Sequence, residues 1–168
     1  MELFRNPDFY IRKVEEGDAD FVYECREFNR KAHFLSPVED DSVEKQRAWI
    51  KTYKKNEQEG KDLYLIFIDK YEEKFGLSRI YDIQNNTAEV GSWVSKPGYK
   101  NFRNVLKSIQ EAFALFLNYH NVQNLTGTVS KDNHSVQNII LKFGFLKVGE
   151  KEDNYLYVLK KENFKRLI

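Results

Sequence analysis

The sequence contains little cysteine, proline or glycine. Its 168 residues include one Cys, three Pro and eight Gly. Because Cys25 is alone, no internal disulfide can form, and no Gly- or Pro-rich stretch marks a linker. Internal repeats and low-complexity segments are absent as well. We therefore expect one domain over residues 1–168, long enough to bury a core without disulfides or a structural metal ion.

Long hydrophobic runs and an excess of one charge are also lacking. The longest apolar run, Leu63 to Ile68, is far shorter than the roughly 20 residues of a membrane-spanning helix, and the N-terminal residues do not resemble an export signal. The net charge is +1, with Lys and Arg scattered along the chain, which argues against nucleic-acid binding. We expect a cytoplasmic protein with neither membrane nor nucleic-acid partners.

Aromatic residues make up 15% of the chain, which favours a substantial core and an aromatic pocket. Hydrophobic periodicity predicts an α+β order of elements. The first helix starts near Asp18, a candidate N-cap, and the second starts at Ser42. The strand at 63–69 is apolar on both faces and should be central. Strands are predicted over 8–14, 63–69, 74–83, 87–95, 124–129, 145–150 and 155–160, and two later helices over about 101–117 and 132–143.

This order resembles the GNAT acyltransferase fold along nearly the whole chain. The most specific match is the segment 133–145, an Asn followed by an apolar helix and Lys-Phe-Gly-Phe, which resembles the closing helix of that family. The resemblance implies a mixed, mostly antiparallel sheet of about seven strands with about four flanking helices. It also implies a splay between the fourth and fifth strands, and acetyl-CoA as the co-substrate.

The resemblance assigns the acetyl-CoA site to three segments. Residues 88–94 resemble the fourth strand, whose free backbone groups hold the pantetheine arm, and residues 99–104 stand where the family places a pyrophosphate-binding loop. In this loop Asn101 and Arg103 occupy positions that are usually small residues, although Asn tolerates the left-handed conformation such a turn can need. The cofactor-binding residues predicted in this way are Trp93, Val94, Ser95, Lys100, Asn101, Phe102, Arg103, Asn104 and Asn133.

Glu89 is the candidate general base, since N-acylation needs a neutral attacking amine. Strand alternation predicts Glu89, Gly91 and Trp93 on one face of the sheet, and the alternative is that Glu89 is an exposed strand-end carboxylate. Many family members carry a Tyr general acid where this chain has Ile140. The acid is therefore unassigned, and the alternatives are water or one of Tyr99, Tyr155 and Tyr157.

The acceptor prediction rests on a resemblance to the branch with bacterial amino-sugar and ribosomal-protein N-terminal acetyltransferases. Arg26 and the segment 42–49 carry it, although Gln46 stands where that branch often has His. The preferred acceptor is the amine of a nucleotide-linked amino sugar, because aromatic side chains could face a base or sugar ring. The predicted substrate-binding residues are Arg26, His33, Phe34 and Glu39.

Three alternatives remain open from the sequence: an N-terminal protein acetyltransferase, a silent CoA-binding domain and a purely structural α+β domain. His120 and His134 have no partner at metal-ligand spacing, so no metal is expected. No Ser or Cys nucleophile motif is present, which favours direct transfer of the acyl group to a small-molecule amine. An edge strand near the C-terminus could pair with a second copy to give a homodimer.

Overall fold

The computed structural model describes residues 1–31, 40–91 and 93–168. Within these ranges the chain forms four α-helices and nine strands. The helices are α1 (Ala19–Lys31), α2 (Val43–Gln58), α3 (Phe102–Leu117) and α4 (His134–Phe143). The strands are β1 (Glu2–Arg5), β2 (Phe9–Lys13), β3 (Leu63–Asp69), β4 (Lys74–Gln84), β5 (Thr87–Val90), β6 (Val94–Ser95), β7 (Asn124–Ser130), β8 (Leu146–Lys151) and β9 (Asn154–Lys160).

The strands form one sheet in the order β1-β2-β3-β4-β5-β7-β9-β8, with β6 paired to β4. All neighbours are antiparallel except β5 and β7, which are parallel. This confirms the predicted α+β class and the mostly antiparallel sheet. Two strands exceed the expected seven: β1 was not predicted, and the strand expected over 87–95 is divided into β5 and β6.

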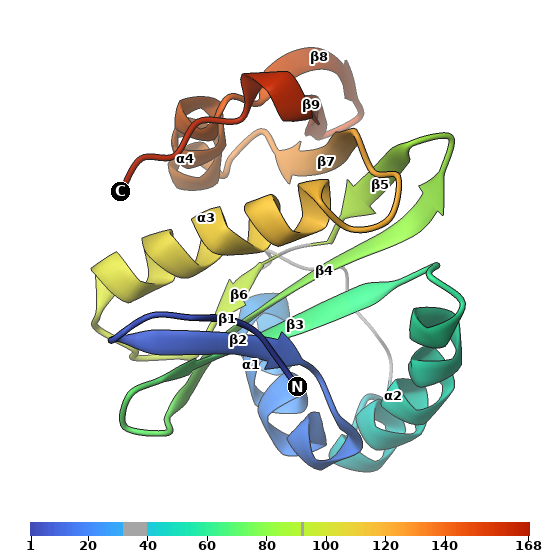
Figure 1. Ribbon diagram of the computed structural model, residues 1–168, viewed down its shortest axis with the longest axis vertical. Helices are drawn as coiled ribbons and strands as arrows, with labels where there is room; N and C mark the ends of the chain where they lie inside the picture. Colours follow the sequence, from blue (N-terminus) through green and yellow to red (C-terminus); the bar gives the residue numbers. More distant parts are fainter. Residues whose placement is uncertain (32–39, 92) are drawn as a thin grey trace.

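The sheet separates two hydrophobic clusters (Figure 1). One lies under α3 and α4, and the other lies under α1 and α2. Every residue of β3 is buried, with Leu65 and Phe67 in the first cluster and Ile66 and Ile68 in the second. The prediction that this strand is central is therefore confirmed, and its two-sided apolar pattern follows from burial on both faces.

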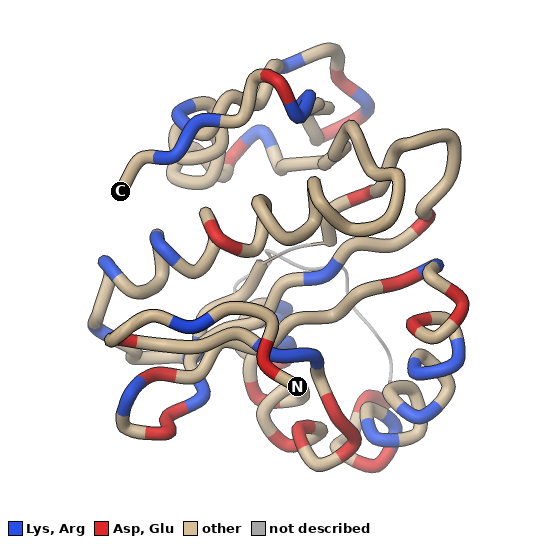
Figure 2. The backbone as a smooth tube through the Cα atoms, viewed as in Figure 1, with Lys and Arg blue, Asp and Glu red and all other residues tan. Residues whose placement is uncertain are grey.

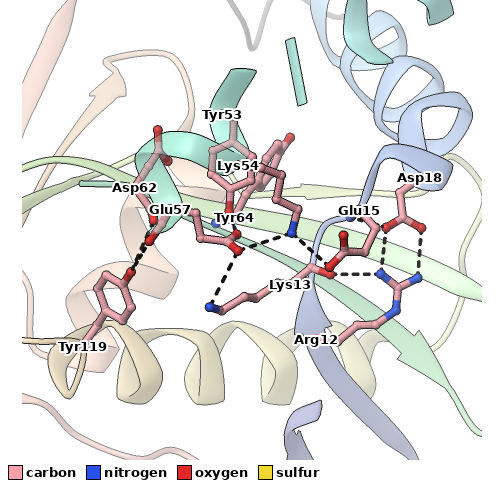
Figure 3. Close-up of polar contacts among 10 residues, drawn as sticks. All are labelled: Arg12, Lys13, Glu15, Asp18, Tyr53, Lys54, Glu57, Asp62, Tyr64 and Tyr119. Carbon is pink, nitrogen blue, oxygen red and sulfur yellow. Dashed lines mark hydrogen bonds and ion pairs between the residues drawn. The ribbon is translucent and has the colours of Figure 1, made fainter. Parts of the chain in front are cut away.

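The start of the first helix differs from the prediction. Asp18 does not cap a helix but closes a 3-10 turn over Glu16–Asp18 that leads into α1. Its buried carboxylate accepts hydrogen bonds from both Nη atoms of Arg12, at 2.7 and 2.9 Å, and from the N–H of Glu15 (Figure 3). The Nζ of Lys74 lies 2.8 Å from the same carboxylate. Asp18 thus ties the turn to β2 and β4.

A second polar cluster fixes α2 against β3. The hydroxyl of Tyr53 accepts the N–H of Tyr64 at 2.7 Å and donates to Glu57 (Figure 3). Lys54 and Lys13 lie 3.3 and 3.7 Å from the carboxylate of Glu57. At the other end of α2, Ser42 accepts the N–H of Lys45, which confirms the predicted helix start at Ser42.

Candidate active site

The sheet divides where β5 and β7 part. The two strands pair at Thr87 with Asn124, Ala88 with Leu125 and Glu89 with Thr126. Beyond these pairs β6 joins β4 alone, and β7 continues along β9. We call the point beyond Glu89 and Thr126 the fork. It confirms the predicted splay between the fourth and fifth strands and leaves the facing edges of both strands free for a ligand.

A change of register at the fork alters which side chains share a face. Val90 of β5 pairs with Ile80 and Val94 of β6 pairs with Leu77, so the register against β4 shifts by one residue from β5 to β6. Consequently Glu89 lies on the face covered by α1 and α2, whereas Trp93 packs edge-on against Phe113 of α3 at 6.0 Å. The prediction that Glu89 and Trp93 share a face was wrong, because strict alternation assumes an unbroken strand.

A cavity of about 900 Å³ opens at the fork and reaches both faces of the sheet. Segments far apart in the sequence line it: the second half of α1, the strands β3 to β7, one residue of α3, the helix α4 and two residues of β9. Of the residues predicted for the site, those that line it are Arg26, Glu89, Trp93, Val94, Ser95 and Asn133. The predicted residues His33, Phe34 and Glu39 fall outside the described ranges.

On the α1–α2 face, the cavity wall is polar and aromatic. Arg79 forms two hydrogen bonds with the carboxylate of Asp62, one of them 2.7 Å long. Its guanidinium also lies 4.7 Å from the ring centre of Trp49 and 4.9 Å from that of Tyr81. These contacts hold Tyr81, which pairs with Glu89 across the β4–β5 hairpin.

Tyr81 and Glu89 also interact electrostatically. Burial first, and then the charge of Glu89, raise the pKa of Tyr81 to about 12, while Arg79 acts in the opposite direction. Tyr81 is therefore protonated at neutral pH, so its hydroxyl is available as a hydrogen-bond donor near the carboxylate. Neither Tyr81 nor Arg79 was predicted from the sequence. The signal that would have identified them is register, since Glu89 faces Tyr81 directly.

The start of α3 is built by residues with two different roles. Asn101 caps the helix by accepting the N–H of Asn104 at 3.1 Å. The side chain of Asn104 is 6% exposed and donates to the hydroxyl of Tyr99 at 3.0 Å, so it supports the loop. Asn101 has φ −80°, and Gly98 supplies the left-handed residue with φ +78°. Asn101 therefore does not use the left-handed conformation that Asn tolerates.

Three cations lie at the start of α3: Lys100, just before the helix, and Arg103 and Lys107, in its first turns. Within residues 1–31, 40–91 and 93–168, no carboxylate lies within ion-pair distance of any of them. Figure 2 shows basic residues along the first turns of α3. The helix N-terminus adds its own positive potential and N–H groups that lack intrahelical acceptors, so this end of the site favours an anion.

Phe102, the first residue of α3, is 63% exposed. It lines a second, smaller hollow of about 260 Å³ between α3 and α4. Trp93, Ser95 and Val136 line both this hollow and the main cavity, so the two spaces adjoin between β6 and the start of α4. Of the predicted cofactor residues, Trp93, Val94, Ser95 and Asn133 therefore line the fork cavity, whereas Phe102 lies at the exposed start of α3.

The start and end of α4 follow the predicted pattern. Asn133 caps the helix by accepting the N–H of Val136 at 3.3 Å, and Gly144 ends it with φ +107°. A Cβ at Gly144 would lie 2.1 Å from the carbonyl oxygen of Asn163, so only glycine fits there. Ile140 is buried and lines the cavity from this helix.

The three candidate tyrosines occupy different places. Tyr157 on β9 lines the main cavity opposite Gly127, and its hydroxyl has no hydrogen-bond partner among the described residues. Tyr99 lines the smaller hollow and donates to Asp69 at 3.2 Å. The ring of Tyr155 lies 4.0 Å from the Nζ of Lys147. Tyr157 is thus the one of these three that faces the fork.

No group of three or more His, Cys, Asp or Glu side chains is arranged to hold a metal ion within the described ranges. None of the helices in the described part of the chain combines the length and apolarity needed to cross a membrane.

The sequence model of the acetyltransferase (GNAT) domain matches residues 8–146. The chain belongs to the GNAT family. It is an N-acetyltransferase, in agreement with the resemblance of the segment 133–145 and with the fork. No curated protein sequence matches the chain.

Similar solved structures include apo FdhC, described as a nucleotide-linked sugar GNAT, with 25% identity and a TM-score of 0.82 over 94% of this chain and 89% of that one. Ribosomal-protein-S5-alanine acetyltransferase from Vibrio fischeri has 14% identity and a TM-score of 0.83 over 99% and 100%. Spermidine N-acetyltransferase from Vibrio cholerae, in complex with CoA and spermine, has 15% identity and a TM-score of 0.80 over 94% and 98%. The fold is shared by proteins with different acceptors.

Proposed function

We propose that the protein transfers an acetyl group from acetyl-CoA directly to the primary amine of a nucleotide-linked amino sugar. The observation that carries this proposal is the fork cavity, which has a carboxylate on one face and leads to a cationic helix start. A thioester at the fork could be reached by an amine from the α1–α2 face. The two substrates would then meet without a covalent enzyme intermediate.

The chain has the features that acetyl-CoA would need. The parted edges of β5–β6 and β7 offer backbone N–H and C=O groups to the amides of the pantetheine arm. The space above Gly127 on β7 is open, because no atom lies within 4 Å of where its Cβ would stand. The start of α3, with Lys100 and Arg103, suits the pyrophosphate through helix N–H groups and charge.

In the proposed reaction Glu89 is the general base. The amine must lose a proton as its nitrogen attacks the thioester carbonyl carbon, and Glu89 lines the cavity on the side that the amine would enter. The protonated hydroxyl of Tyr81 lies beside this carboxylate and keeps it oriented. Glu89 acts either directly or through one water molecule.

Tyr157 is the proposed proton donor to the leaving thiolate. When the tetrahedral intermediate collapses, the C–S bond breaks and the sulfur takes up a proton. Burial raises the pKa of Tyr157, so its hydroxyl carries a proton at neutral pH. Its position at the fork, in the cavity that Ile140 also lines, lets it take the role that a Tyr on α4 serves in many GNAT enzymes.

The nucleotide-linked acceptor is supported by the similarity to FdhC at 25% identity, together with the aromatic cavity wall. The ribosomal-protein enzyme, at 14%, supports the fold alone. The experiment is to incubate the protein with acetyl-CoA and uridine diphosphate-linked amino sugars, following thiol release and the mass of the product. One added acetyl group on the sugar is expected. Acetyl-CoA binding without transfer to any amine would favour a silent CoA-binding domain instead.

A further inference from the structure

Arg26 differs from the other arginines around the α1–α2 face. It is half-buried in α1 and lines the cavity, yet no carboxylate pairs with it among the described residues. By contrast, Arg79 is bonded to Asp62, and Arg30, one turn further along α1, lies 2.6 Å from Asp41. A half-buried guanidinium without a counter-ion is costly unless a ligand or water satisfies it.

Two of the charged side chains that line the cavity form no ion pair within the described part of the chain. The charged side chains of the lining are Arg26, Arg79, Lys96 and Glu89. Asp62 neutralises Arg79, and Glu73 lies 2.9 Å from the Nζ of Lys96. What remains is the guanidinium of Arg26 and the carboxylate of Glu89, which line the same cavity. This pattern suits an acceptor with one amine and one anionic group.

Two neighbours of Arg26 would support such a ligand. Tyr64 is 3% exposed and lines the cavity, close enough to Arg26 for the two to interact electrostatically. Phe28, two residues after Arg26, is 50% exposed at the cavity wall. An exposed aromatic ring that lines the same cavity as a guanidinium offers a stacking surface to a ligand whose phosphate pairs with that guanidinium.

We propose that Arg26 binds a phosphate of the acceptor and that Phe28 faces the nucleobase of the acceptor. The α1–α2 face of the cavity would then select anionic amines and reject polyamines. This inference rests on the proposed function and specifies the acceptor's second recognition point. Spermidine carries several positive charges and would be repelled by Arg26, whereas the phosphates of a nucleoside diphosphate would form an ion pair with Arg26.

The test compares three acceptors and three variants. The acceptors are a uridine diphosphate-linked amino sugar, free glucosamine, which has no anionic group, and spermidine. The variants are Arg26→Gln, Arg26→Lys and Arg47→Gln. Arg47 is an exposed cation on α2 that serves as the matched control. Uridine diphosphate is added as an inhibitor, and its binding is also measured directly by calorimetry in the absence of acetyl-CoA.

We expect uridine diphosphate to compete with the sugar nucleotide in the wild-type protein. Arg26→Gln should raise the KM for the sugar nucleotide and weaken uridine diphosphate binding by about 10- to 100-fold, the loss typical of a charge-assisted hydrogen bond. Its KM for glucosamine and acetyl-CoA should not change. Arg26→Lys should give an intermediate KM and an intermediate affinity for uridine diphosphate, because lysine keeps the positive charge but lacks the planar set of guanidinium donors.

Two results would overturn the subsite: wild-type protein that does not bind uridine diphosphate, or Arg26→Gln that affects glucosamine and the sugar nucleotide equally. Efficient acetylation of spermidine would also contradict it. Failure of the proposed function is distinguishable, because it would appear as no acetyl transfer to any of the three amines. In that case the calorimetric comparison of uridine diphosphate binding still decides for or against Arg26.

Discussion

The cations of this protein fall into two groups that differ in their partners. Around β2 and α2, Arg12 meets Asp18 and Lys54 meets Glu15, each within 3.0 Å (Figure 3). Around the fork and the start of α3, Arg26, Lys100 and Arg103 meet no carboxylate within the described ranges. The first group joins elements to one another, and the second faces a cavity or a helix N-terminus.

This difference separates the charges that maintain the fold from those available to a ligand. A buried carboxylate such as Asp18 requires its cations, because removing one partner leaves a charge without compensation. A cation without a partner contributes little to the fold but binds an anion that enters its surroundings. Substitutions in the first group should therefore change stability, and those in the second should change binding or turnover.

The largest effect is expected at Glu89. Glu89→Gln keeps the size of the side chain but removes the proton acceptor, so kcat should fall about 100-fold or more, as is typical when general base catalysis is lost. The affinity for acetyl-CoA, measured by calorimetry, should stay unchanged. Glu150→Gln, on the exposed hairpin of β8 and β9, is the control. A Glu89→Gln variant with normal kcat would refute the assigned base.

The next effect concerns stability and pH. Burial raises the pKa of Asp18, but Arg12 and Lys74 outweigh it and lower the pKa from 3.8 to about 2. The depressed pKa stabilises the fold above about pH 4, and this contribution of about 2 kcal/mol disappears as the pH falls towards 2. Asp18→Asn should lower the free energy of unfolding by a similar amount at pH 7, measured by urea denaturation.

The same variant should lose the pH dependence that Asp18 causes. Between pH 4 and pH 2 its stability should decline less steeply than that of the wild-type protein. Asp20→Asn, which removes an exposed carboxylate two residues away, is the matched control and should behave like wild type. Equal slopes for Asp18→Asn and wild type would contradict the paired state of Asp18.

A smaller effect is expected at Tyr157. Tyr157→Phe removes the hydroxyl and keeps the ring in its buried position, so kcat should fall about 10-fold, at the low end for general acid catalysis. Unfolding by urea should change little, because that hydroxyl has no hydrogen-bond partner among the described residues. Tyr155→Phe, on the same strand but outside the cavity lining, should retain full activity. Similar losses in both variants would argue against the assigned acid.

Much of the fold could be predicted from sequence, because its signals are local. The two-sided apolar run at 63–69, the Ser42 cap and the Gly144 terminus each fix an element by short-range chemistry. The N-terminal strand β1 was missed because its four residues, Glu2–Arg5, have a half-exposed pattern at the edge of the sheet. Edge strands give weak periodicity, since only part of one face is buried.

The site was less predictable because it depends on register and on contacts between distant segments. The one-residue change of register between β5 and β6 places Trp93 on the other face from Glu89, which no periodicity could reveal. Arg79 and Tyr81 enter the site through β4, which looks like an ordinary strand in the sequence. The hydrogen bond from the side chain of Asn104 to the hydroxyl of Tyr99 also joins residues that no sequence pattern pairs, and the cofactor role of Asn104 stays a prediction.

The most direct test of the account is the affinity for acetyl-CoA, measured by isothermal titration, of the wild-type protein, Arg103→Glu and Arg12→Glu. The account predicts that Arg103→Glu binds about 10-fold more weakly with unchanged stability, because it loses a phosphate contact and gains a repulsive charge. Arg12→Glu should lose stability, and its folded fraction should bind normally. Acetyl-CoA binding that is undetectable in the wild type, or that is unaffected by Arg103→Glu, would contradict the assignment of the unpaired cations to the ligand.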